Sequence, residues 1–81
     1  MTLADARVKD WVEIVGMAVD ADGRSIRLED LGFLVGTSVR VDRRAALGDP
    51  TIYELRGTRI ALRKADAALI EVEAAATPPT R

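Results

Sequence analysis

The sequence predicts a mainly β fold, a small closed barrel of five strands with one short helix. Five short segments are rich in β-branched residues or alternate apolar with polar positions, as half-buried strands do. Gly, Pro and Asp residues separate these segments at short intervals, and one segment alone has helical spacing. Short strands joined by close turns are typical of small barrels, whose closure removes exposed strand edges.

The first strand is expected over residues 11–19, a run rich in β-branched residues. Leu3 and Val8 precede it and are expected to anchor the start of the chain on the core. Gly16 lies inside the run and predicts a bulge or a sharp bend. The Asp20-Ala21-Asp22-Gly23 stretch that follows is a turn signal.

The segment after this turn allows two interpretations. Residues 25–28 alternate as a strand would, and Asp22-Gly23 could close a hairpin. Ile26, Leu28 and Leu31 also share one face of a short helix, and Gly32 is well placed to end it. We therefore expect a helix over about residues 25–31.

The other strands are expected at residues 37–44, 51–56, 58–63 and 69–72, with a helical turn at 64–68. Inward positions alternate with outward ones along them, so that Val39, Val41, Tyr53, Leu55, Ile60 and Leu62 are expected in the core. We expect one domain over residues 1–73. Residues 74–81 contain Pro78-Pro79 and little apolar surface to bury, and they are expected to form a flexible tail.

The composition argues against an enzyme. The 81-residue chain carries a net charge of −1 and contains neither His nor Cys, the usual general base and thiol nucleophile. No Gly-rich phosphate loop is present, and the carboxylate pairs Asp20/Asp22, Glu29/Asp30 and Glu71/Glu73 are expected to be solvated. Ferrous iron sites normally combine imidazole with carboxylate. We therefore expect no catalytic residue, no cofactor and no dedicated metal site.

Two groups of residues are candidates for binding a partner. Arg40, Arg59 and Arg63 are expected to point outward, where they either form a basic patch or pair with Asp42, Glu54 and Asp66. The apolar run 33–35 lies between two glycines and is either a plug for the barrel end or an exposed docking knob. The low net charge and scarce aromatic residues do not indicate nucleic-acid binding.

Four stretches together resemble the FeoA family. They are Leu28 to Thr37, with its Leu-Gly and second Gly; Arg44 to Pro50, ending in Leu-Gly-Asp-Pro; Arg56 to Arg63, Arg-Gly-Thr-Arg-Ile-Ala-Leu-Arg; and Ala67 to Val72. They cover roughly residues 3–73 in the family's order and spacing. The resemblance implies an SH3-like barrel and an accessory role in ferrous iron uptake. Its implied partner is the cytoplasmic GTPase domain of the membrane transporter FeoB, which it would bind and modulate.

On this basis we expect a non-enzymatic cytoplasmic adaptor with no membrane span of its own, peripheral to the inner membrane through FeoB. The expected partner-binding residues are Leu28, Leu31, Phe33, Leu34, Arg40, Arg59 and Arg63. Weak homo-oligomerisation is left open. One alternative is a direct transition-metal-binding protein or iron chaperone. Another is a stand-alone relative of the C-terminal SH3-like domain of iron-dependent repressors. Because the chain starts at Met1 and has no DNA-binding helices, we expect a stand-alone protein rather than a domain of such a repressor.

Overall fold

The computed structural model describes residues 1–19 and 22–75. Five antiparallel strands form one sheet in the order β4-β3-β2-β1-β5, which confirms the mainly β prediction. Two short helices and one 3₁₀ turn complete the fold over these described residues. The elements are η1 (Leu3–Asp5), β1 (Trp11–Met17), α1 (Arg24–Asp30), β2 (Ser38–Arg44), β3 (Thr51–Leu55), β4 (Thr58–Leu62), α2 (Lys64–Ala67) and β5 (Ile70–Ala74).

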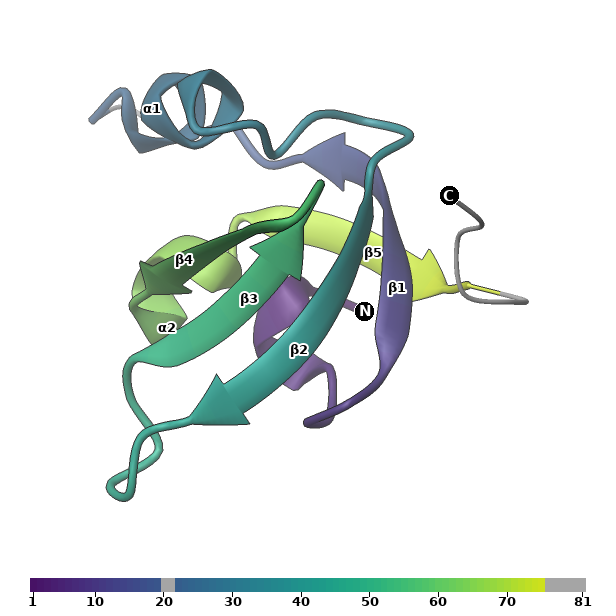
Figure 1. Cartoon of the computed structure of the whole chain (residues 1–81). Coiled ribbons are helices and arrows are strands. Elements are labelled where there is room, and N and C mark those ends of the chain that lie inside the picture. The colour runs from purple at the N-terminus through teal and green to yellow at the C-terminus, as the bar shows by residue number, and fades with distance from the viewer. Residues whose placement is uncertain (20–21, 76–81) are drawn as a thin grey trace.

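The sheet coils strongly on itself, with α1 across one end and the turn between β2 and β3 at the opposite end (Figure 1). Among the described residues no ladder joins β4 to β5, so the expected barrel is rolled up but not closed by strand pairing. Thr2 bridges to Glu71 on the free side of β5, and η1 contacts both β5 and α2. The start of the chain thus covers the edge that an open sheet would leave exposed.

Two bulges bend the sheet. The register of β1 against β5 shifts between Ile14 and Gly16, which confirms the predicted bulge at Gly16. A second shift, between Val41 and Arg43, interrupts the pairing of β2 with β3. Because a bulge increases local twist, these two positions help a sheet this short to curl around its core.

The core lies inside the coiled sheet and is built from the inward positions of the alternating strands. Its members are Leu3, Ala6, Val12, Ile14, Leu28, Phe33, Val39, Val41, Tyr53, Leu55, Leu62, Ala67, Ile70 and Val72. Ile60 is partly buried against this cluster. Val8 is exposed, so only Leu3 of the two predicted N-terminal anchors contributes to the core.

The ambiguous segment is a helix, as predicted. α1 ends in a pair of hydrogen bonds in which Gly32 N–H donates to the Glu29 carbonyl and Phe33 N–H to the Leu28 carbonyl. This arrangement is a Schellman motif, and it requires the positive φ of Gly32, +108°. It turns the chain back so that Phe33 enters the core beside Leu28.

Two predictions reach beyond the described residues. The turn signal at residues 20–23 is described only for Asp22 and Gly23, and residues 76–81 of the predicted tail are not described. Ala74, which we assigned to the tail, is instead the last residue of β5. Ala75 extends the pairing of β5 with β1, because its N–H donates to the Trp11 carbonyl over 3.2 Å.

Candidate docking surface

Exposed apolar side chains gather in the sequence around α1. Ile26 and Leu31 come from the helix and its C-terminal end, and Leu34 and Val35 from the loop that follows. These four residues are 41 to 69% exposed, which is high for large apolar side chains. We call them the α1 end. Exposed apolar groups grouped in this way mark candidate interaction sites.

Two of the predicted contact residues do not belong to this surface. Leu28 is 3% exposed and Phe33 is fully buried, so neither offers appreciable surface to a partner. The run Phe33-Leu34-Val35 therefore combines the two alternatives, a plug and an exposed knob. Phe33 plugs the end of the barrel, and the next two residues project from it. Leu31 and Leu34 are the predicted apolar contacts that remain exposed.

A shallow groove of about 230 Å³ lies beside the α1 end. One wall is α1, and the other combines the edge strand β4 with the start of α2; its lining residues are Arg24, Arg27, Leu28, Leu31, Ala61, Leu62 and Asp66. Arg24 and Asp66 form an ion pair of 3.4 Å across it. Because β4 is an end strand of the sheet, an extended segment of a partner could lie along this groove.

Arg40 and Arg59 belong to a different surface, the outer face of the sheet. In the register of the strands Arg40 lies opposite Glu54, and Glu54 opposite Arg59. Arg40 Nη1 is 3.4 Å from Asp42 Oδ1 and 3.7 Å from Glu54 Oε1, and Arg59 Nε is 3.4 Å from Asp42 Oδ2. Arg43 also approaches Asp42, at 3.7 Å. This face is a network of mixed sign, the second of our two alternatives for these arginines.

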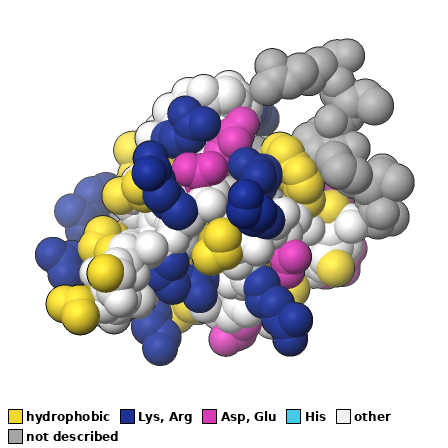
Figure 2. Space-filling model, turned by 60° about the horizontal axis from the view of Figure 1, so that its bottom comes forward, with side chains coloured by type: hydrophobic (Ala, Val, Ile, Leu, Met, Phe, Trp, Pro, Cys, Tyr) yellow, Lys and Arg dark blue, Asp and Glu magenta, His cyan; other side chains and the backbone are white. Residues whose placement is uncertain are grey.

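Figure 2 shows basic side chains spread over one face of the molecule, with acidic side chains between some of them. Arg63 differs from Arg40 and Arg59. It is exposed, follows directly after β4, and forms no ion pair within residues 1–19 and 22–75. Of the three predicted arginines, it is the one whose charge no described carboxylate offsets.

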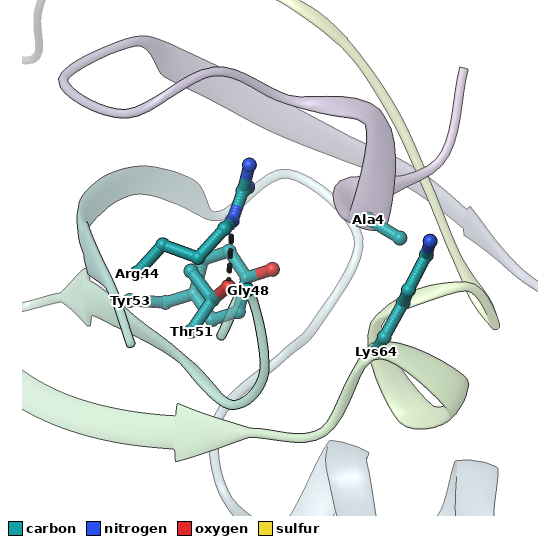
Figure 3. Close-up of a pocket in the computed structure, with 6 residues that line it drawn as sticks. All are labelled: Ala4, Arg44, Gly48, Thr51, Tyr53 and Lys64. Atoms are coloured by element: carbon teal, nitrogen blue, oxygen red, sulfur yellow. Dashed lines mark hydrogen bonds between the residues drawn. The ribbon is translucent and has the colours of Figure 1, made fainter. Parts of the chain in front are cut away.

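Sequence reasoning missed a recess at the other end of the molecule, lined by Ala4, Arg44, Gly48, Thr51, Tyr53 and Lys64. Figure 3 shows Arg44 and Lys64 on opposite sides of it, with the Tyr53 hydroxyl directed into the space between them. Burial raises the pKa of Tyr53, and hydrogen bonding with Thr51 and the charge of Arg44 partly offset that rise. Tyr53 is therefore a neutral phenol at physiological pH. No sequence signal joins these residues, which come from five segments: η1, β2, the β2–β3 turn, β3 and α2.

The described residues form neither a metal-ligand cluster nor a membrane-spanning helix. Over the residues that the structure describes, no three His, Cys, Asp or Glu side chains converge on a point where they could hold a metal ion. In the same part of the chain no helix has the length and apolar character needed to cross a membrane.

A family model described as the FeoA domain matches residues 1–74. The chain belongs to the FeoA family. A curated relative from Porphyromonas gingivalis, an Fe(2+) transport protein A/Fe(2+) transporter FeoB fusion protein, is 34% identical over 76 residues. The match covers 90% of this chain and 8% of the fusion protein, so the chain spans a small part of that relative's length.

Solved structures of FeoA proteins have the same fold. The NMR structure of an FeoA-like protein from Clostridium acetobutylicum has a TM-score of 0.86 and 27% identity, and the match covers 100% of this chain and 93% of that one. The crystal structure of Stenotrophomonas maltophilia FeoA complexed with zinc has a TM-score of 0.81 and 28% identity, with 90% and 89% covered. That protein is described as a prokaryotic SH3 domain protein, which confirms the predicted SH3-like fold.

The FeoA fold also occurs inside larger regulators. The manganese regulator SloR has a TM-score of 0.78 and 16% identity, with 93% of this chain and 34% of SloR covered. This likeness shows a shared fold. Family membership confirms the predicted link to ferrous iron transport.

Proposed function

We propose that this FeoA-family chain is a non-enzymatic, cytoplasmic adaptor that binds FeoB and modulates its activity. The observation that carries the proposal is the Porphyromonas gingivalis relative, in which an Fe(2+) transport protein A part and FeoB form one polypeptide. Fusion keeps two parts in permanent proximity, as expected if they act on each other. The partner surface in this proposal is the cytoplasmic GTPase domain of FeoB.

The α1 end is the proposed contact surface. Leu31 and Leu34 supply exposed apolar area, while the buried side chains of Leu28 and Phe33 anchor the helix and the loop to the core. Interfaces gain most of their affinity from a few such well-supported apolar anchors. The groove along β4 offers room for a partner segment next to these anchors.

Arg63 is the proposed basic contact at the rim. Its exposed charge could meet an acidic group of the partner without first breaking an ion pair. Arg40 and Arg59 would have to leave Asp42 and Glu54 to do the same. They therefore stay secondary contacts in the proposal, and rim charges of this kind affect association rate more than affinity.

The test compares two variants that introduce the same chemical group at opposite ends of the molecule. Leu31→Asp combined with Leu34→Asp should weaken binding to the isolated FeoB cytoplasmic domain at least about tenfold, since each change places a charge at an apolar contact. Leu47→Asp is the matched control, because Leu47 is 97% exposed in the β2–β3 turn, far from α1. Isothermal titration calorimetry measures both affinities.

Equal affinity for wild type and the double variant would remove the α1 end as the contact surface. Absence of binding by the wild-type chain would remove the adaptor function itself. Circular dichroism of both variants establishes that they remain folded, as expected for substitutions at exposed positions.

Direct metal binding is the second candidate, favoured by the zinc complex of the Stenotrophomonas maltophilia relative. A titration of this chain with Fe²⁺ or Zn²⁺ separates the two functions. Stoichiometric binding at micromolar or lower concentration would favour a metal-binding protein over an adaptor.

A further inference from the structure

The recess at the β2–β3 end contains a fixed cation whose charge has no carboxylate partner. Arg44 Nε donates a hydrogen bond to Thr51 Oγ1 over 2.9 Å, and Arg44 Nη2 donates to the Ala6 carbonyl, also over 2.9 Å. Both acceptors are neutral. The guanidinium is therefore held in one orientation beside the neutral Tyr53 hydroxyl, and the N–H groups that these contacts do not use remain able to bind something else.

Lys64 supplies a second cation on the opposite wall (Figure 3). Within residues 1–19 and 22–75 neither Arg44 nor Lys64 forms an ion pair, whereas Arg40 and Arg59 are both paired. The Thr51 and Tyr53 hydroxyls add neutral hydrogen-bonding groups to the lining. The recess is thus lined by two positively charged hydrogen-bond donors and by no carboxylate.

Two aspartates lie near the recess without lining it. Asp49 Oδ1 accepts a hydrogen bond from the Lys64 backbone N–H over 2.9 Å. The Asp5 carboxylate accepts hydrogen bonds from the Thr2 backbone and hydroxyl, which lower its pKa, and the charge of Lys64 lowers it further. These carboxylates are engaged elsewhere, but their charge reduces the positive potential, so an anion should bind weakly.

From this arrangement we propose that the recess binds a phosphate group. An arginine fork recognises two phosphate oxygens at once, and lysine adds a point charge that suits a dianion. The volume of about 260 Å³ is larger than a lone carboxylate needs and leaves room for part of an attached group. The phosphate can come from a soluble ester or from a lipid headgroup, and the binding chemistry is the same for both.

NMR titration of the ¹⁵N-labelled chain tests the proposal with three probes: inorganic phosphate, adenosine monophosphate, and phosphatidylcholine vesicles containing phosphatidic acid. Potassium chloride at matched ionic strength is the reference. We expect saturable shifts of the Arg44 Nε–H signal and of the Gly48, Thr51 and Lys64 amides, with dissociation constants of about 1 mM. Shifts with the soluble probes would identify a soluble phosphate, and shifts with vesicles alone a lipid headgroup.

Lys64→Gln should weaken this binding about tenfold, the loss expected for one charged hydrogen-bonding partner. Within residues 1–19 and 22–75 the Lys64 side chain is exposed and forms no ion pair, so the variant should stay folded. Arg56→Gln removes the same charge from the turn between β3 and β4, outside the recess, and should leave the phosphate affinity unchanged. Absence of saturable shifts with all three probes would overturn the proposal, and so would equal weakening by the two variants.

Discussion

Phe33 and Leu34 are adjacent in the chain and have opposite environments. Phe33 is fully buried among the core residues, and Leu34 is 41% exposed. The Schellman motif at the end of α1 produces this difference, because it turns Phe33 back toward Leu28 and directs the following residues outward. A residue that composition alone would assign to a docking knob is therefore a support beneath it.

Phe33→Ala should destabilise the protein by about 3–5 kcal/mol, the usual cost of removing a buried aromatic side chain. Leu34→Ala is the matched control and should cost about 1 kcal/mol or less, since Leu34 is partly solvated. Urea denaturation followed by circular dichroism measures both. Similar free energies of unfolding for the two variants would show that Phe33 is not the plug.

Alternation along the strands was sufficient to predict the inward positions of single residues such as Val39, Val41, Tyr53 and Leu55. It could not separate Phe33 from Leu34, because consecutive apolar residues in a loop have no period. Arg40 and Arg59 pair with Asp42 because the strand register brings them together. The sequence did not determine this register, so it allowed either a basic patch or ion pairing. The Arg44–Lys64 recess could not be predicted, because Ala6, Thr51 and Lys64 meet only through the fold.

α1 is the element on which the proposed docking surface depends. Seven residues are too few for a helix to be stable by itself, so tertiary contacts must hold it. Leu28 provides the buried contact, and Gly32 provides the termination that fixes where the following loop begins. The helix and its cap therefore form one structural unit.

Gly32→Ala should destabilise the protein by about 1–2 kcal/mol, because a side chain resists a φ of +108°. Space is not the cause, since the new Cβ would lie 3.5 Å from Leu55 Cδ1, an ordinary contact. Gly16→Ala is the control: its Cβ would lie 3.6 Å from Glu71 Cβ, and its φ is outside the positive range.

Thermal unfolding followed by circular dichroism measures the effect of both glycine substitutions. The Gly32 variant should unfold at a clearly lower temperature than the Gly16 variant. A reversed order would mean that the cap contributes less to α1 than the bulge contributes to the sheet.

The whole molecule separates three surfaces around one coiled sheet. The α1 end is apolar, the outer sheet face carries balanced charges, and the Arg44–Lys64 recess is basic and polar. Turn spacing and strand alternation predicted the barrel itself, and the family resemblance predicted its partner. The division into three surfaces depends on which distant residues the coiled sheet brings together. No local sequence pattern encodes that arrangement.

The proposed docking to FeoB is tested most directly by mapping the residues that the FeoB cytoplasmic domain contacts. In an NMR titration of the ¹⁵N-labelled chain with the FeoB cytoplasmic domain, we predict that the largest perturbations fall on residues 24–36 and 61–63. The amides of Arg40, Glu54 and Arg59 on the outer sheet face should change little. Perturbations centred on that outer face, with the α1 end unchanged, would contradict the proposed mode of docking.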